Sequence, residues 1–218
     1  MERYFILDKF NTWYDWRLIL TDKDVTPPEP NTNYVTIDGM SGSLDLSEAL
    51  TGEVTYKDRK VSASFWTDYG SRKDREKLLR DIRVALHGKK VKIIEPDDPD
   101  HYFIGRIVVK SQSNNLAYAE FKIEATCEPW RYSIDESVRM INVNNQIVTD
   151  VVIHNNGVKT LSPVITVTGS VDITYNGVKT SLTAGSYKIS DIKLRQGVNV
   201  IGVSGNGSVT FTYKEADL

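Results

Sequence analysis

The composition of this chain changes abruptly near residue 135, and this change constrains the fold more than any single motif does. All four tryptophans and six of the seven prolines lie in residues 1–133, together with most of the charge. Residues after 138 contain no tryptophan and are rich in Val, Ile, Thr, Asn and Gly. Such a shift is typical of a domain boundary, and 218 residues are enough for two domains. We therefore expect two domains, residues 1–134 and residues 135–218.

The first domain is expected to contain several β-strands. Alternating apolar and polar residues predict strands at 12–20, 34–39, 54–56, 60–66, 90–94, 102–109 and 117–126. After the first of these, residues 21–33 contain Pro27, Pro28 and Pro30, which cannot donate hydrogen bonds to a strand ladder. That segment is expected to be a long loop or arm.

One helix is expected, from about Ser71 to Leu86. Ser71 is a suitable N-cap, Asp74 stands in the capping-box position, and Gly88 follows the end. Apolar residues at spacings of three and four predict one buried stripe, and the charged residues between them, Arg75 included, are assigned to the opposite face. The first domain is thus expected to be α+β, a mostly antiparallel sheet with one helix packed on it.

The second domain shows no helical pattern. Its short apolar runs are separated by turn signals, of which Asn176-Gly177 is the strongest indication of a hairpin. Further turns are expected at Asn155-Asn156-Gly157, Ala184-Gly185 and Gly205-Asn206-Gly207. Strands at this spacing predict an all-β sandwich.

Charge and cysteine content exclude several classes of protein. The formal net charge is −2 and no long basic tract exists, which argues against nucleic-acid binding. No apolar run approaches the roughly 18 residues of a membrane span, and the first eight residues do not resemble a signal peptide, so we expect folding in a cytoplasm. The single cysteine, Cys127, is expected to be a buried apolar residue.

No catalytic motif is present. His87, His101 and His154 fall on three separate elements, and the sequence contains neither a G-x-S-x-G motif nor a pair of histidines at metal-binding spacing. We therefore expect that the protein is not an enzyme and has no cofactor.

The acidic turn at Asp97, Asp98 and Asp100, next to His101, is the one cluster with the character of a metal site. Calcium is the alternative to a simple turn, but a calcium loop collects ligands over about 12 residues, and here the chain becomes apolar directly after His101. We expect no metal, and we assign an interaction role to five residues of this turn and of the proline segment: Asp97, Asp98, Asp100, Pro27 and Pro28.

Several motifs in a fixed order resemble the distal tail proteins of long-tailed (siphovirus-type) bacteriophages and of related prophages and tail-like particles. They are Gly39-Met40-Ser41-Gly42-Ser43-Leu44-Asp45, Leu86-His87-Gly88, Asp97-Asp98-Pro99 followed by Gly105-Arg106, the Cys127-Glu128-Pro129-Trp130-Arg131-Tyr132 segment, Gly197-Val198-Asn199-Val200-Ile201, and the ending from Val209 to Glu215.

This resemblance implies a belt domain that forms a hexameric ring, followed by a galectin-like or carbohydrate-module-like sandwich. It also implies a hub of the tail tip, assembled in the host cytoplasm and carried in the virion. The implied partners are the tail tube protein, the tail-associated lysin or fibre hub, and receptor-binding proteins.

The alternative is a carbohydrate-binding protein that uses the sandwich for recognition of a host surface. Sugar sites present exposed aromatic rings, and the second domain offers only Tyr175, Tyr187, Phe211 and Tyr213. The last two share one side of a predicted strand and are expected to face the core. Sugar binding is therefore allowed by this fold but not expected.

Overall fold

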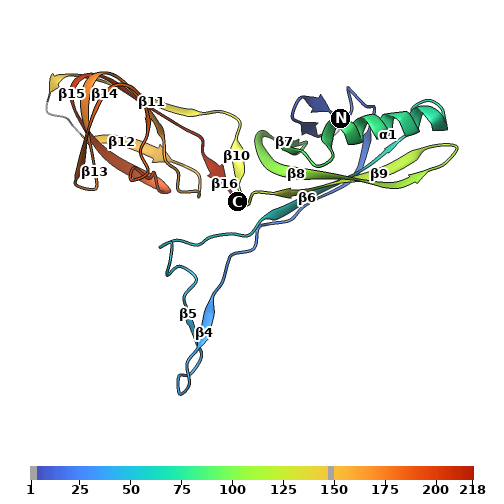
Figure 1. Ribbon diagram of the computed structural model, residues 1–218, viewed down its shortest axis with the longest axis horizontal. Coiled ribbons are helices and arrows are strands. Elements are labelled where there is room, and N and C mark those ends of the chain that lie inside the picture. The colour runs from blue at the N-terminus through green and yellow to red at the C-terminus, as the bar shows by residue number, and fades with distance from the viewer. Residues whose placement is uncertain (1–3, 147–149) are drawn as a thin grey trace. The chain divides into compact units, whose positions relative to one another are not determined.

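The computed structural model describes residues 4–146 and 150–218 (Figure 1). The chain divides into two compact units, one that runs to Trp130 and includes Leu218, and one that spans Arg131–Asp217. We call them unit 1 and unit 2. Each has its own cluster of buried apolar side chains.

Unit 1 contains an antiparallel sheet with the strand order β2-β1-β7-β8-β9-β6-β3. The strands are β1 (Ile6–Leu7), β2 (Phe10–Asn11), β3 (Ile19–Val25), β6 (Arg59–Thr67), β7 (Lys90–Glu95), β8 (Asp98–Asn114) and β9 (Ala119–Cys127). Every second side chain of β6 and almost every second one of β9 is buried, as the alternating sequence predicts. On the buried face, Phe65 stacks on Phe121 with ring centroids 5.7 Å apart and meets Phe5 edge-on at 6.2 Å.

The helix α1 (Arg72–Leu86) packs against β8 of this sheet. The capping box is confirmed: the Ser71 hydroxyl accepts a hydrogen bond from the Asp74 amide, and the Asp74 carboxylate accepts one from the Ser71 amide. Leu79, Ile82 and Leu86 are buried, as expected from their spacing. The assignment of Arg75 to the exposed face was wrong, because its side chain is 1% exposed.

Arg75 is buried because the backbone around it supplies acceptors for its guanidinium. Nη1 donates to the Gly70 carbonyl at 2.8 Å, and Nη2 donates to the carbonyls of Asn115 and Leu116 at 2.9 and 3.0 Å. A buried charge is tolerated when its donors are satisfied in this way. The arginine therefore joins the start of α1 to the loop between β8 and β9.

The predicted strand at 12–20 was wrong over most of its length. The Asn11 side chain accepts the amides of Trp13 and Tyr14, both at 3.0 Å, and this stabilises a turn instead. The strand begins only at Ile19 and continues to Val25, into the segment that was expected to be a loop.

Unit 2 is all-β. Its main sheet has the order β11-β15-β13-β14, and β12 also pairs with β15. The strands are β11 (Ser137–Gln146), β12 (Asp150–Asn155), β13 (Val164–Tyr175), β14 (Val178–Lys188) and β15 (Gly197–Tyr213). A short antiparallel pair joins β10 (Arg131–Ser133) to β16 (Ala216–Asp217). The predicted hairpin is confirmed, since Asn176 and Gly177 have φ angles of 50° and 79° between paired Tyr175 and Val178.

The turns predicted at Ala184-Gly185 and Gly205-Asn206-Gly207 were wrong, because these residues lie inside the long strands β14 and β15. The glycines mark irregular positions within strands: Gly169 and Gly207 have φ angles of 84° and 150° and are directly paired across β13 and β15. The fold class is confirmed for both parts, a mostly antiparallel sheet with one helix followed by an all-β unit.

Candidate interaction site

The most exposed part of the chain is residues 26–56, which we call the arm. No residue of the arm is buried. Its two strands, β4 (Tyr34–Thr36) and β5 (Ser43–Asp45), pair only with each other, and the turn between them contains Gly39 and Gly42 with φ angles of 85° and 86°. A two-stranded hairpin of this size is marginally stable alone in water. The arm is therefore a candidate for contact with another protein surface.

The arm exposes several large apolar side chains to solvent. Leu50 is fully exposed, and Tyr34 is 61% exposed. The others are Val35, Ile37, Met40, Leu44 and Val54. A contiguous group of exposed apolar residues is typical of an interaction site.

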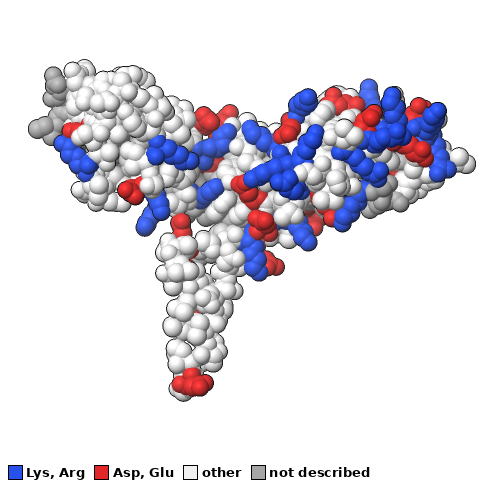
Figure 2. Space-filling view, viewed as in Figure 1, with Lys and Arg blue, Asp and Glu red and all other residues white. Residues whose placement is uncertain are grey.

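The arm is also acidic. It carries Glu29, Asp38, Asp45, Glu48 and Glu53 and contains no Lys, Arg or His. Figure 2 shows this segment, located by β4 and β5 in Figure 1, as white and red, with blue beginning at its base. A surface that fits the arm should thus be both apolar and basic.

The base of the arm is held by a β-bridge and by hydrogen bonds. Pro30 and Tyr56 form an isolated β-bridge, and the Asn31 amide donates to the Thr55 carbonyl at 2.8 Å. Below this, the buried guanidinium of Arg59 donates to the carbonyls of Thr26 and Pro129 at 3.1 and 3.2 Å. These contacts fix where the arm leaves unit 1.

Pro27 and Pro28, two of the five residues to which the sequence assigned an interaction role, lie in the first part of the arm. Pro27 is exposed and Pro28 is half-buried. The prolines signalled the start of the arm, but no local signal gave its extent to residue 56.

The acidic turn is engaged within unit 1. Asp97 forms an ion pair with Lys23 of β3 at 2.9 Å, and Lys23 also pairs with the buried carboxylate of Glu95. Partial burial would lower the pKa of Lys23, but the hydrogen bonds and charges of Glu95 and Asp97 outweigh it and raise that pKa. Asp97 is therefore part of a contact between β3 and the β7–β8 turn.

The other two acidic residues differ from each other. Oδ1 of Asp98 and Nδ1 of His101 form a hydrogen bond of 2.8 Å. Asp100 is exposed. Over residues 4–146 and 150–218, no three His, Cys, Asp or Glu side chains come together as metal ligands. Asp97 thus lies in the turn before β8, whereas Asp98 and Asp100 belong to β8 itself.

Cys127 lies on the buried face of β9, as expected, and burial raises the pKa of its thiol to about 12. The thiol is therefore protonated at neutral pH and a poor nucleophile. Among the described residues, no helix combines the length and the apolar character that crossing a membrane requires.

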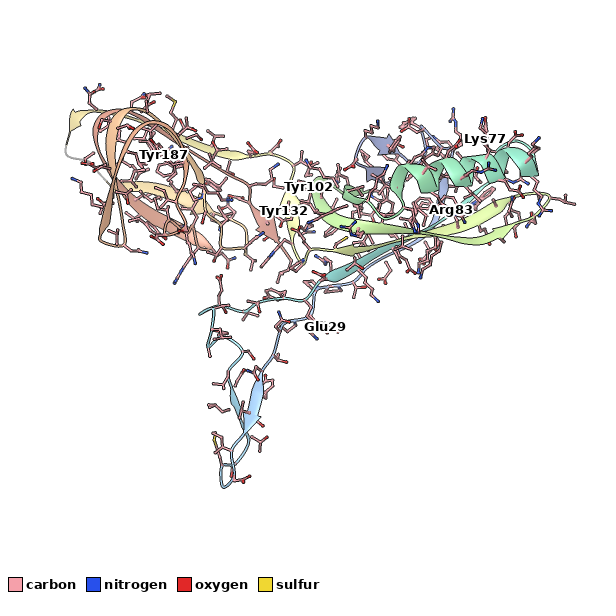
Figure 3. All side chains as sticks on the ribbon, viewed as in Figure 1. Glu29, Lys77, Arg83, Tyr102, Tyr132 and Tyr187 are labelled. Atoms are coloured by element: carbon pink, nitrogen blue, oxygen red, sulfur yellow. The ribbon has the colours of Figure 1, made fainter. Side chains whose placement is uncertain are left out.

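The outer surface of α1 has the opposite charge to the arm. Lys73, Lys77, Arg80 and Val84 follow one another at i, i+4, i+7 and i+11 and form the ridge farthest from the buried face. Figure 3 shows Lys77 projecting from α1, and Figure 2 shows several blue side chains, with red ones among them, over the region of this helix. Within the described part of the chain, none of the three cations forms an ion pair closer than 4.0 Å, and Val84 is 73% exposed. We call these four residues the α1 ridge.

A cleft of about 430 Å³ runs along one flank of the α1 ridge. Lys77, Leu78 and Asp81 line it from the helix, and the turn after β2 lines it from the other side with Tyr14 and Arg17. The rings of Tyr14 and Tyr69, which also lines the cleft, are 64% and 54% exposed. The surface beside the α1 ridge is thus partly aromatic.

Comparison with known proteins identifies the fold. No family model matches the sequence, and no curated protein matches it significantly. The structure matches the crystal structure of the Dit protein of phage SPP1 with a TM-score of 0.72 and 15% sequence identity, over 97% of this chain and 98% of that one. That protein is described as a paradigm of the hub adsorption apparatus in phages that infect Gram-positive bacteria. The resemblance to phage distal tail proteins is therefore confirmed at the level of the fold.

Proposed function

We propose, from the fold that this chain shares with the Dit protein of phage SPP1, that the protein is a structural hub of a phage tail tip. The observation that carries this proposal is the similarity over both units, because the match covers 97% of the chain. In this role unit 1 assembles with copies of itself into a hexameric ring. The ring joins the tail tube to the tail-associated lysin or fibre hub and to receptor-binding proteins, and it is part of the virion.

The exposed arm supports a role in assembly. Its apolar side chains are accessible in the single chain, and burial of such surface is the main driving force for association.

The alternative of a sugar-binding unit 2 has less support. None of its four candidate rings is exposed. Phe211 is buried in the core, the Tyr213 hydroxyl donates to the His154 carbonyl at 2.5 Å, and the Tyr187 hydroxyl donates to the Thr183 carbonyl at 3.0 Å. Tyr175, Tyr187 and Tyr213 also pack against the core of unit 2, so none of these rings is the exposed platform on which a pyranose stacks.

Electron microscopy of the purified chain, alone and with tail tube protein, tests the proposal. Six-fold rings are expected. The matched control replaces residues 32–54 by a short Gly-Ser linker, which the bridge between Pro30 and Tyr56 allows because it already places the two ends side by side. Rings from the intact chain but not from this control support assembly through the arm. A chain that stays monomeric under all these conditions contradicts the proposed function.

A further inference from the structure

We infer that the arm of one copy binds the α1 ridge of a second copy of this chain. This inference rests on the proposed assembly of copies and specifies the two surfaces that meet. It starts from charge, because the arm carries acidic residues and no basic ones, whereas the α1 ridge carries three cations.

The acidic surface is the arm. Five carboxylates lie within 31 residues that contain no basic residue. The hydrogen bonds that Ser47 donates to Asp45 lower the pKa of that carboxyl, so this residue is firmly ionised at neutral pH. Glu29 forms an ion pair with Lys57 at the base of the arm. Farther out, Asp38 and Glu48 are exposed and are available to a partner.

The basic surface is the α1 ridge. Lys73 and Lys77 are four residues apart, and Lys77 and Arg80 are three apart, so their side chains are neighbours on the helix surface. Like charges at these spacings destabilise an isolated helix by about 0.2–0.5 kcal/mol per pair. An acidic partner would remove this repulsion.

Several other basic groups of unit 1 already have acidic partners. On the outer face of the sheet, Lys90 pairs with Glu128 at 2.6 Å, and both Lys110 and Lys122 pair with Glu124. On the helix itself, Arg72 pairs with Glu76 at 3.5 Å. The α1 ridge differs because its three cations have no such partner within the described residues.

Both surfaces also expose apolar side chains. The arm exposes Leu50, Tyr34 and Met40. The α1 ridge exposes Val84, and the rings of Tyr14 and Tyr69 are exposed in the cleft beside it. Desolvated apolar contacts surrounded by opposite charges are typical of specific interfaces. The occupant we assign to the α1 ridge is thus the arm of another copy.

Site-directed cross-linking tests the contact directly. The native thiol is buried and protonated, so a cysteine placed on the surface is the only reactive one in a folded chain. Leu50→Cys labels the arm and Val84→Cys labels the α1 ridge, both at exposed positions. The two single variants are mixed, allowed to assemble and treated with a short bismaleimide. A covalent dimer in the mixture, much weaker in either variant alone, is expected.

Charge reversal is a second test of the same contact. The pair Lys77→Glu and Arg80→Glu should weaken association of copies by about tenfold, as should the pair Asp38→Lys and Glu48→Lys in the arm. Combining all four changes should restore association to near that of the unmodified chain. The matched control reverses two exposed cations of unit 2, Lys188→Glu and Lys193→Glu, and should have little effect.

The outcomes separate this inference from the proposed function. If rings form normally when Lys77 and Arg80 are replaced by Glu, the proposed contact is wrong but the hub proposal stands. The same holds if rings form but the mixture of the two cysteine variants gives no cross-link. A cross-link that forms within one chain of the Leu50→Cys and Val84→Cys double variant, and not between chains, also contradicts it. If no copies of the unmodified chain associate under any condition, both proposals fail.

Discussion

Arg75 shows how one side chain can join two separate segments of unit 1. Its guanidinium is 1% exposed and satisfies three backbone carbonyls, one before α1 and two in the β8–β9 loop. Removal of a buried charged donor leaves these acceptors without partners, and such changes are strongly destabilising. The planar fork is essential to the arrangement, because an ammonium group cannot reach the same set of acceptors.

We expect Arg75→Ala to lower the free energy of unfolding of unit 1 by about 3 kcal/mol, and Arg75→Lys to recover only part of it. All four tryptophans lie in unit 1, so tryptophan fluorescence during urea unfolding reports on this unit. Arg72→Ala, at an exposed ion pair on the same helix, should change stability by less than about 1 kcal/mol. Equal effects of the two substitutions would contradict the role given to Arg75.

Cys127 should give unit 1 a specific dependence on alkaline pH. The thiol ionises near pH 9 when unfolded, and burial raises its pKa to about 12 when folded. A raised pKa of an acid stabilises the fold below the unfolded value, and that stability is lost as the pH rises from 9 to 12. Urea unfolding over this range should therefore show a steeper loss of stability for the native chain than for Cys127→Ala. The same slope in both would rule out this contribution.

Among the strands of unit 2, two positions require glycine for different reasons. A Cβ at Gly207 would lie 1.8 Å from the Thr168 carbonyl oxygen, whereas one at Gly177 in the β13–β14 hairpin would have nothing within 4 Å. The first position has no room for a Cβ atom because the neighbouring strand lies too close. The second requires glycine only for its φ angle of 79°.

Gly207→Ala should accordingly destabilise unit 2 by at least about 2 kcal/mol, and Gly177→Ala by about 1 kcal/mol. Calorimetry of the full chain is the measurement, with the transition of unit 2 identified as the one that tryptophan fluorescence does not report. A smaller effect at Gly207 than at Gly177 would contradict the close approach of β13 and β15.

The sequence predicted those elements whose signals are local. The cap of α1 by Ser71 and the hairpin at Asn176-Gly177 depend on residues within a few positions of each other, and both are confirmed. The glycines at 185, 205 and 207 were misread because glycine marks both turns and irregular positions in strands. The contacts of Lys23 with the acidic turn and of Arg75 with the β8–β9 loop join residues far apart in sequence, so periodicity could not reveal them.

At the scale of the whole molecule, the chain consists of two units that differ in composition and in core. The short pair of β10 with β16 belongs to unit 2, and the loop after β12 adds to it through the Asn156 amide, which donates to Glu215 at 3.2 Å. We therefore propose that unit 2 folds alone, and that β10 contributes to its stability.

Two fragments test this proposal. Residues 131–218 should fold with a β-type circular dichroism spectrum and a cooperative melt. Residues 135–218, which begin at the boundary predicted from composition, should also fold but melt several degrees lower because they lack the β10–β16 pair. Aggregation of both fragments would show that unit 2 depends on the rest of the chain.

The mass of the purified full-length chain in solution tests the central claim most directly. Mass photometry over a concentration series, with and without tail tube protein, measures how many copies associate. Six copies of a 24.6 kDa chain give a particle of about 148 kDa, and the account predicts this species, with its loss when residues 32–54 of the arm are replaced. A chain that remains at 24.6 kDa at every concentration and with its partner would contradict the account.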